Sequence, residues 1–255
     1  MTNQAMATKH GTGGIDEHSL RVDLAAAFRL AAHFDWHESV GNHFSAAVSE
    51  DGQQFLLNPK GSHFSTICAS ELIRLHAEDD SVLEKEKAPD SSAWCVHGSL
   101  HRTLPHARVI LHCHPPYGTA LCALKNPALL PIDGNTARFY GRLAIDLDYG
   151  GISDQRQEGA RLAKKMDGHI AMMMGNHGVS VVGDTVAEAF ELLYFLERAS
   201  KTMVLAYSTG QPLNTMSPEL AEKTARGWDA YRFMATDHFA HLKAMLDRTD
   251  PTYRD

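Results

Sequence analysis

The sequence predicts a single α/β domain, because segments with helical apolar spacing alternate with short β-type runs and no compositional linker separates them. Hydrophobic residues make up 44% of the 255 residues and charged residues 22%, a composition typical of a globular protein with a buried core. The formal net charge of −7 gives no overall basic field for a nucleic-acid backbone. The sequence also lacks an apolar run near the roughly 18 residues of a membrane span. We therefore expect neither nucleic acid nor membrane as a partner.

The chain is predicted to begin with a tail and a helix. Residues 1–17 hold few large apolar side chains and are expected to form a mobile tail, which leaves residues 18–255 as the domain. From Ser19 onward the pattern becomes helical, because apolar side chains such as Leu24 and Phe28 recur at three- and four-residue spacing.

A β-hairpin and a loop are predicted next. Asp51-Gly52 separates the β-type segments 44–48 and 54–57, which is the sequence pattern of a hairpin turn. Residues 58–62 (N-P-K-G-S) follow and indicate a loop.

Capping residues mark where the later helices begin. A helix should start near Asp90-Ser91-Ser92, which are preferred N-cap types, and should stop before Pro105. Residues 185–188 (T-V-A-E) form a capping-box sequence, and Ser-Pro at 217–218 opens a last helix. The expected helices then cover residues 70–77, 90–104, 155–166, 185–208 and a final segment from 217, and the expected strands cover residues 108–114, 144–147, 169–174 and 179–182.

A histidine pair ends one of these predicted strands. His112 and His114 are two positions apart, so on a strand both imidazoles lie on one face and Cys113 lies on the other. Two imidazoles on one face can share a divalent metal, although strand histidines are also often satisfied by hydrogen bonds. A third imidazole, His177, lies in a glycine-flanked turn, but spacing alone cannot place it beside the pair. Three histidines with an open fourth position are typical of a catalytic rather than a structural zinc site.

Several motifs occur together in a recognisable order. His112-x-His114 follows the helix opened by Ser91-Ser92, and the remaining segments are Gly41-Asn42, Asn58-Pro59-Lys60-Gly61, Arg138-Phe139-Tyr140-Gly141, Asn176-His177-Gly178 and the helix 186–207. Over about residues 19–210 the chain resembles the class II aldolase/adducin family. Its members include fuculose phosphate aldolases, ribulose phosphate epimerases, related dehydratases and decarboxylases, and the head domain of adducin.

The resemblance implies a fold and a metal. The fold would be a three-layer α/β/α sandwich around a mostly antiparallel central sheet. One divalent ion, zinc in the first place, would be held by His112, His114 and His177. Imidazole also suits manganese, cobalt and nickel, so the sequence does not separate these metals.

The resemblance also implies an anion site. Asn42, Gly61, Ser91 and Ser92 match the positions that hold a substrate phosphate. The two serines begin a predicted helix, where free N–H groups and the helix dipole favour an anion, and Lys60 adds a cation beside a glycine. The alternatives are that the serines only cap the helix and that Lys60 is a solvated loop residue. A phosphate and a carboxylate would use this site equally.

The sequence departs from the family at one catalytic position. In the sugar-phosphate aldolases the residue after the paired serines is a carboxylate that serves as general acid/base, whereas here it is Ala93. His97 and His101 share a helix face and are candidate replacements, either as a base or as a further metal ligand. They could instead orient the metal-binding histidines by hydrogen bonds. Tyr140 is a candidate proton donor, with a buried structural hydrogen bond as the alternative.

The sequence thus predicts a metal-dependent lyase. It would perform aldol cleavage or decarboxylation on a small hydroxy-carbonyl substrate bearing a phosphate or carboxylate, with the metal stabilising an enediolate. A dehydratase or epimerase with the same chemistry is an alternative, and so is an adducin-like non-catalytic binding or assembly module, which the alanine at position 93 favours.

Two further expectations concern assembly and location. Family members are commonly tetramers, and the last helix carries many large apolar side chains, so we expect a homo-oligomer, with a tetramer as one form. These side chains, which should pack on the body or on a neighbouring subunit, are Trp228, Tyr231, Phe233 and Phe239. The four cysteines show no CxxC spacing and no secretory signal precedes them, which predicts reduced thiols in the cytoplasm.

Overall fold

The fold is built on one seven-stranded sheet. The structure is a computed structural model that describes residues 16–148, 150–151 and 156–255, so the expected tail lies almost wholly outside the described residues. The strands follow the order β3-β2-β1-β4-β7-β6-β5 across the sheet. Their bounds are β1 His43–Ala47, β2 Gln54–Leu57, β3 Ile73–His76, β4 Val109–Cys113, β5 Leu143–Asp146, β6 Ala171–Met174 and β7 Val179–Gly183. β5 and β6 run parallel and the other neighbouring strands run antiparallel, which confirms the mostly antiparallel sheet.

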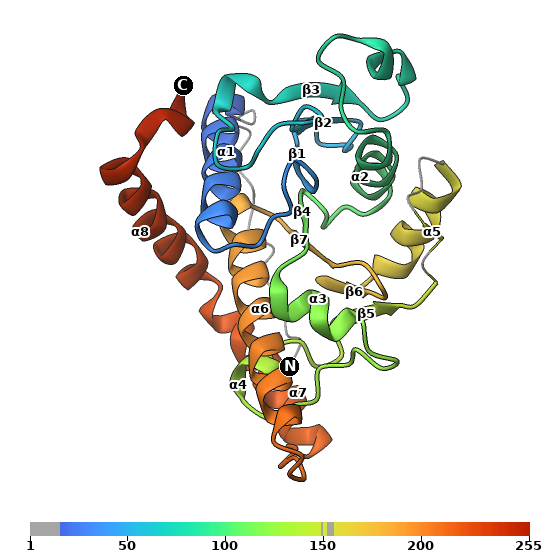
Figure 1. The fold of residues 1–255 in the computed structure, drawn as a ribbon, viewed down its shortest axis with the longest axis vertical. Helices are drawn as coiled ribbons and strands as arrows, with labels where there is room; N and C mark the ends of the chain where they lie inside the picture. The colour runs from blue at the N-terminus through green and yellow to red at the C-terminus, as the bar shows by residue number, and fades with distance from the viewer. Residues whose placement is uncertain (1–15, 149, 152–155) are drawn as a thin grey trace, which may run out of the picture.

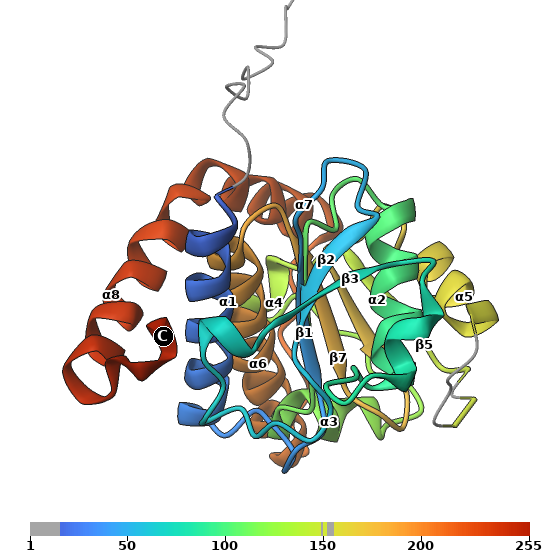
Figure 2. The same ribbon diagram turned by 90° about the horizontal axis from the view of Figure 1, so that it is seen from above.

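Helices cover both faces of this sheet, as the three-layer prediction requires. The helices are α1 Glu17–His33, α2 Ser91–Thr103, α3 Pro116–Cys122, α4 Gly134–Ala137, α5 Arg156–Met166, α6 Val186–Ser208, α7 Pro218–Gly227 and α8 Phe233–Thr249, with short 3-10 turns η1 Ala69–Glu71, η2 Asp80–Glu84, η3 Trp228–Tyr231 and η4 Pro251–Arg254. α1, α6 and α8 lie on one side of the sheet and α2 and α5 on the other (Figures 1 and 2). None of the helices in the described ranges has the length and apolar character needed to cross a membrane.

Alternation along β4 decides which layer the histidine pair faces. Leu111 and Cys113 belong to the core cluster that includes Phe28 of α1, whereas Ile110 belongs to the cluster that includes Leu162 of α5. His112 is two positions after Ile110 and lies on the same face of the strand, so it faces the α2/α5 layer. The predicted opposite orientation of Cys113 follows from the same alternation.

The helix predicted for residues 70–77 is wrong. Its start forms only the η1 turn, and β3 follows, paired antiparallel with β2. Leu75 is buried while Arg74 and His76 are exposed, so the segment alternates with the period of an edge strand. The hydrogen-bonding groups on the open edge of β2 outweigh the local helical spacing of this segment.

The last predicted helix is also not continuous. It divides into α7, the η3 turn and α8, and its aromatic residues differ in burial. Phe239 is buried against Phe190, with ring centroids 5.7 Å apart, while Tyr231 and Phe233 are 52% and 62% exposed. The short helices α3 and α4 were not predicted from the sequence.

Candidate metal centre and its pocket

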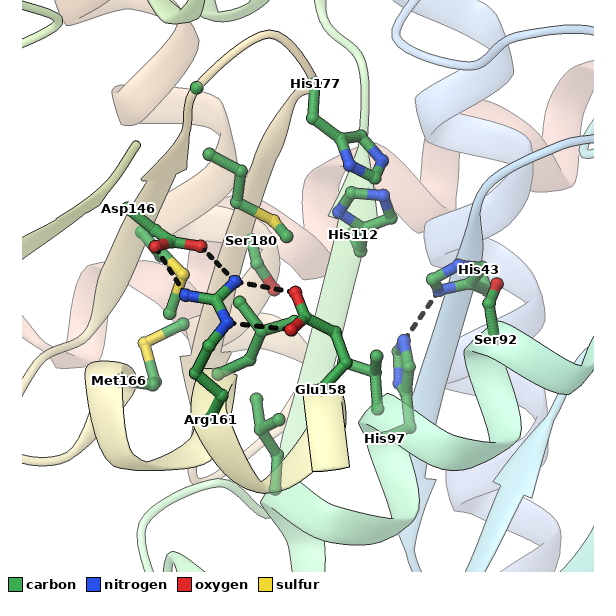
Figure 3. A pocket seen from close by; sticks show the side chains of 16 residues that line it. His43, Ser92, His97, His112, Asp146, Glu158, Arg161, Met166, His177 and Ser180 are labelled. Atoms are coloured by element: carbon green, nitrogen blue, oxygen red, sulfur yellow. Dashed lines mark hydrogen bonds and ion pairs between the residues drawn. The ribbon is translucent and has the colours of Figure 1, made fainter. Parts of the chain in front are cut away.

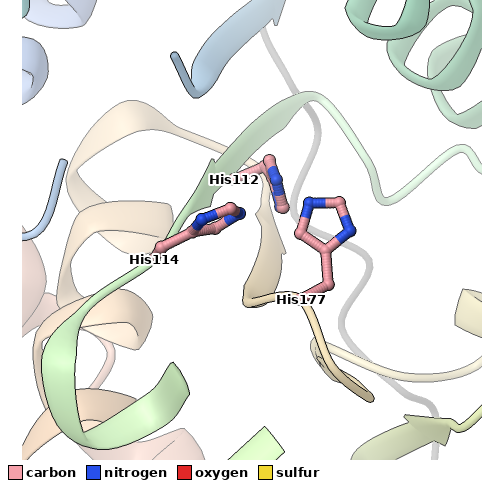
Figure 4. Close-up of side chains that lie close together, drawn as sticks. All are labelled: His112, His114 and His177. Atoms are coloured by element: carbon pink, nitrogen blue, oxygen red, sulfur yellow. The ribbon is translucent and has the colours of Figure 1, made fainter. Parts of the chain in front are cut away.

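Three histidines converge where β4 ends and β7 begins. β4 and β7 pair with Cys113 opposite Val179, which brings the turn before β7 beside the end of β4. One ring nitrogen from each of His112, His114 and His177 lies within 4.8 Å of the other two. Figure 4 shows the three rings facing one another across the end of the strand. The structure therefore brings together the three residues predicted to hold a metal.

The turn that carries His177 has a local reason for its sequence. Asn176 adopts a positive φ of 54°, a conformation that asparagine tolerates better than most residues. Gly178 follows, and a Cβ at this position would lie 2.2 Å from Cδ2 of His114. Glycine is thus required here because the turn packs directly on a proposed metal ligand.

Hydrogen bonds indicate which ring nitrogen His112 and His114 present to the centre. His112 Nδ1 donates to the carbonyl of Val179 at 3.0 Å, because a carbonyl can only accept, and this leaves Nε2 with its lone pair. His114 Nδ1 contacts the Glu38 carboxylate at 2.6 Å. Its Nε2 is buried and has no hydrogen-bond partner among the described residues. A carboxylate behind a histidine is the arrangement that orients metal-binding imidazoles in proteins.

The loop that carries Glu38 is held by one of the predicted anion ligands. Asn42 Oδ1 accepts a hydrogen bond from the Glu38 N–H at 3.0 Å, and Asn42 itself has a φ of 70°. Asn42 therefore supports the carboxylate that orients His114, whatever else it contacts.

Burial favours the neutral form of two imidazoles of this cluster, those of His112 and His177. Burial lowers the pKa of His177 to about 4, with a further contribution from His114. Burial also lowers the pKa of His112 well below 6.5, and its histidine neighbours add to this effect. Neutral imidazoles are the form that binds metal ions. Three converging imidazole donors, one of them the buried Nε2 of His114 without a partner among the described residues, fit a divalent ion such as zinc.

A chain of buried hydrogen bonds runs from the cluster into the protein. The ring of His43 stacks on His112 with centroids 4.8 Å apart, because the two residues are paired across β1 and β4. His43 Nδ1 contacts His97 Nε2 at 2.7 Å, and His97 Nδ1 contacts the hydroxyl of Ser45. The same hydroxyl contacts His101 Nε2 at 2.7 Å.

The last residue of this series of hydrogen bonds, His101, sets the donor and acceptor of every hydrogen bond in it. His101 Nδ1 must donate to the carbonyl of Ala107, which lies at 2.7 Å. His101 Nε2 then accepts from Ser45, Ser45 accepts from His97, and His97 accepts from His43. The Nε2 atom of His43 is thereby left with a lone pair.

A pocket extends from the histidines between the sheet and the α2/α5 layer, and we call it the histidine pocket. Its polar lining includes His43, Ser92, His97, His112 and His177 (Figure 3). His101 is not part of this lining, so of the two predicted helix histidines only His97 reaches the pocket.

An ion-pair cluster from β5 and α5 also lines the histidine pocket. Arg161 contacts both oxygens of Asp146 at 2.7 and 2.8 Å, and both oxygens of Glu158 at 2.6 and 2.7 Å (Figure 3). The remaining lining is mostly apolar and consists of Val96, Leu100, Leu162, Met166, Met172 and Met174.

The other predicted residues are more dispersed. Lys60 lines a separate surface depression together with Glu71 and Glu86, and Gly61 follows it in an exposed turn with a φ of 80°. Tyr140 lies just after α4, which packs on α6 and α7, and it does not line the histidine pocket.

Three features of the site were missed in the sequence, namely His43, Glu38 and the Arg161 cluster. Asp90 was expected only as part of the helix start near residues 90–92, and the structure makes it the N-cap of α2.

Comparison with known proteins decides the family. The model of the "Class II Aldolase and Adducin N-terminal domain" matches residues 22–204. The chain belongs to the class II aldolase and adducin family. A putative aldolase class 2 protein from Caulobacter vibrioides is 31% identical over 100% of both chains. The crystal structure of an aldolase II superfamily protein from Pseudomonas syringae superposes with a TM-score of 0.84 at 30% identity, covering 96% of this chain and 98% of that one.

A family member with a named activity is also similar. Decarboxylase NovR from Streptomyces niveus is 28% identical over 84% of this chain and 81% of its own. Class II aldolases are metal-dependent, which agrees with the donor set formed by the three histidines.

Proposed function

We propose that this class II aldolase family member is a metal-dependent lyase for a small hydroxy-carbonyl substrate, acting by aldol cleavage or decarboxylation. The observation that carries the proposal is the convergence of His112, His114 and His177 within 4.8 Å, with the buried Nε2 of His114 unpartnered. When bound there, a divalent metal, zinc in the first place, supplies a Lewis acid that polarises a carbonyl oxygen. Manganese, cobalt and nickel are the alternative ions.

The chain's own residues would orient the substrate around this centre. His43 lines the histidine pocket and has a lone pair on Nε2, so it can accept a hydrogen bond from a substrate hydroxyl. His97 lies directly behind His43, and its Nε2 accepts the hydrogen bond from His43 Nδ1, so His97 can take up that proton when His43 gains one at Nε2. We retain His97 over His101 as the candidate proton-transfer residue because only His97 lines the pocket.

A homologue's name supports the decarboxylation variant of the proposal. NovR is called a decarboxylase and matches most of this chain, so C–C cleavage next to a carbonyl is the chemistry to test first. A dehydratase or epimerase would use the same centre. Of the predicted anion ligands, Ser92 is the one that lines the histidine pocket, and we propose that it contacts the polar end of the substrate.

One observation favours a second candidate function. Ala93 stands where the aldolases of the family have their carboxylate, as expected for an adducin-like binding or assembly module that has lost the chemistry. Such a module has no need of three converging imidazoles, so we rank the lyase first.

The deciding measurement is metal content. Protein purified without a histidine tag should contain about one divalent ion per chain, and the variant His112→Ala/His114→Ala should contain none. His241→Ala, which removes an exposed histidine of α8, is the control and should keep the ion. Unchanged metal content in the double variant would refute the site.

A second measurement separates the two functions. The metal-loaded protein should release CO2 or an aldehyde from at least one member of a panel of hydroxy- and oxo-acids and sugar phosphates, and the double variant should not. A fully loaded protein without turnover across this panel would favour the non-catalytic module.

A further inference from the structure

The donors at the start of α2 are already occupied by a side chain of the protein. Asp90 Oδ1 accepts hydrogen bonds from the N–H groups of Ser92 and Ala93 at 3.0 and 3.4 Å. The hydroxyl of Ser92 also donates to this oxygen. These are the groups at a helix N-terminus that would otherwise bind an external anion. One carboxylate oxygen therefore takes three donors that a phosphate would need.

Asp90 brings a negative charge as well as an acceptor. Burial alone would raise the pKa of Asp90, but the hydrogen bonds from Ser92 and Ala93 outweigh it and hold the pKa below its usual value. The carboxylate is thus ionised at neutral pH. It also interacts electrostatically with His43, which lines the histidine pocket, so its charge acts on the space where a substrate would lie.

Among the described residues that line it, the histidine pocket has no unpaired cationic side chain to offset this charge. Among its described lining residues, Arg161 alone carries a fixed positive charge, and both Asp146 and Glu158 hold it in two-pronged ion pairs. Lys60, the cation expected from the sequence, lies in the separate depression with Glu71. A phosphate dianion would therefore face carboxylates without a free cation on the protein.

We propose that Asp90 is a specificity-determining residue that excludes phosphorylated substrates, so that the substrate is an unphosphorylated hydroxy-carbonyl compound with an apolar remainder. The apolar part would lie against Val96, Leu100, Leu162 and Met172 in the histidine pocket. This inference rests on the proposed function, since it names the substrate class of the same centre. The first residues of α2 then have a role that requires no phosphate, because Ser91 begins the helix and Ser92 donates to Asp90.

The experiment measures binding of inorganic phosphate by isothermal titration calorimetry, with the protein as purified and again after chelation. Asp90→Gly frees the helix donors at little cost to the helix, because glycine is tolerated at an N-cap. Asp90→Asn keeps the cap and removes only the charge. The matched control is Asp16→Gly, which changes the N-cap of α1, where Asp16 accepts from Ser19 in the same way but away from the pocket.

The expected result is that Asp90→Gly binds phosphate at least about tenfold more tightly than wild type in both preparations, and that Asp90→Asn lies between them. Asp16→Gly should bind phosphate as wild type does. Equal phosphate affinity in wild type and both Asp90 variants would overturn the inference, and so would turnover of a sugar phosphate by the wild type. If Asp90→Gly does not fold, the inference is tested by comparing the phosphate affinity of Asp90→Asn with that of wild type, and equal affinities would overturn it.

This experiment and the metal measurement can fail separately. A wild type without metal refutes the proposed function, while the chelated samples still show whether Asp90 blocks phosphate. A wild type that holds metal and binds phosphate at the helix refutes only the role of Asp90.

Discussion

The buried histidine chain predicts how the stability of the protein responds to acid, and His101 allows the sharpest test. His101 is 4% exposed, and burial lowers its pKa from 6.5 to about 3. The folded protein therefore keeps His101 neutral at pH 5, whereas the unfolded chain protonates it. Its stabilising contribution is complete above the unfolded pKa and decreases as the pH falls. Between pH 7 and pH 5 this residue alone should remove about 2 kcal/mol of unfolding free energy.

The perturbation is His101→Gln, and the assay is urea unfolding at pH 7 and pH 5 in the presence of a chelator. At pH 7 the variant should lose about 1–3 kcal/mol, because glutamine cannot keep both hydrogen bonds of the imidazole. From pH 7 to pH 5, however, it should lose about 2 kcal/mol less than wild type. His241→Gln changes an exposed histidine and should follow wild type. Equal acid sensitivity of His101→Gln and wild type would refute a neutral buried His101.

Three further substitutions test the residues that hold His114 in place and a buried carboxyl group of α6. Glu38→Gln removes the charge that orients His114 and should weaken metal binding about 10–100-fold in a competition titration with a chelating dye. Gly178→Ala sets a methyl group 2.2 Å from the His114 ring and should cost about 1–3 kcal/mol of unfolding free energy, whereas Gly134→Ala meets no atom within 4 Å and should cost little. Burial raises the pKa of Glu197 to about 7, so ionisation of this carboxyl destabilises the fold as the pH rises. In urea unfolding, the unfolding free energy of Glu197→Gln should therefore rise by about 2 kcal/mol relative to that of wild type between pH 5 and pH 8. Unchanged metal affinity in Glu38→Gln would contradict the first expectation, and an equal loss of stability in Gly178→Ala and Gly134→Ala would contradict the second. The third would be contradicted if the unfolding free energies of Glu197→Gln and wild type changed in parallel with pH.

The half of the site that lies within one strand could be predicted from the sequence. His112 and His114 share a face because side chains alternate along any strand, and this requires no knowledge of the neighbours. His177 is brought to them by the register that sets Cys113 opposite Val179. That register depends on contacts between distant segments, so only the family resemblance could place the third histidine.

The features that were missed depend on pairings of the same kind. His43 reaches the centre because it lies opposite His112 across β1 and β4, and nothing near His43 in the sequence signals this. The edge strand β3 was mistaken for a helix because an apolar spacing compatible with both forms is decided by the open edge of β2. Asp90 is different, because its signal is local: aspartate is a preferred cap residue, and α2 begins within the segment 90–92 that the sequence indicates.

The alanine at position 93 carries less weight against catalysis once Asp90 is considered with it. Ala93 is 1% exposed and lies in an apolar cluster with Phe55 and Trp94, outside the lining of the histidine pocket. A carboxylate at this position would be buried in that cluster or would turn toward the helix start, where Asp90 already sits. Residues at the N-cap and three positions later belong to one helical turn, so two carboxylates there would repel each other. A carboxylate at 90 therefore disfavours one at 93, so Ala93 does not by itself indicate that the three-histidine centre has been abandoned.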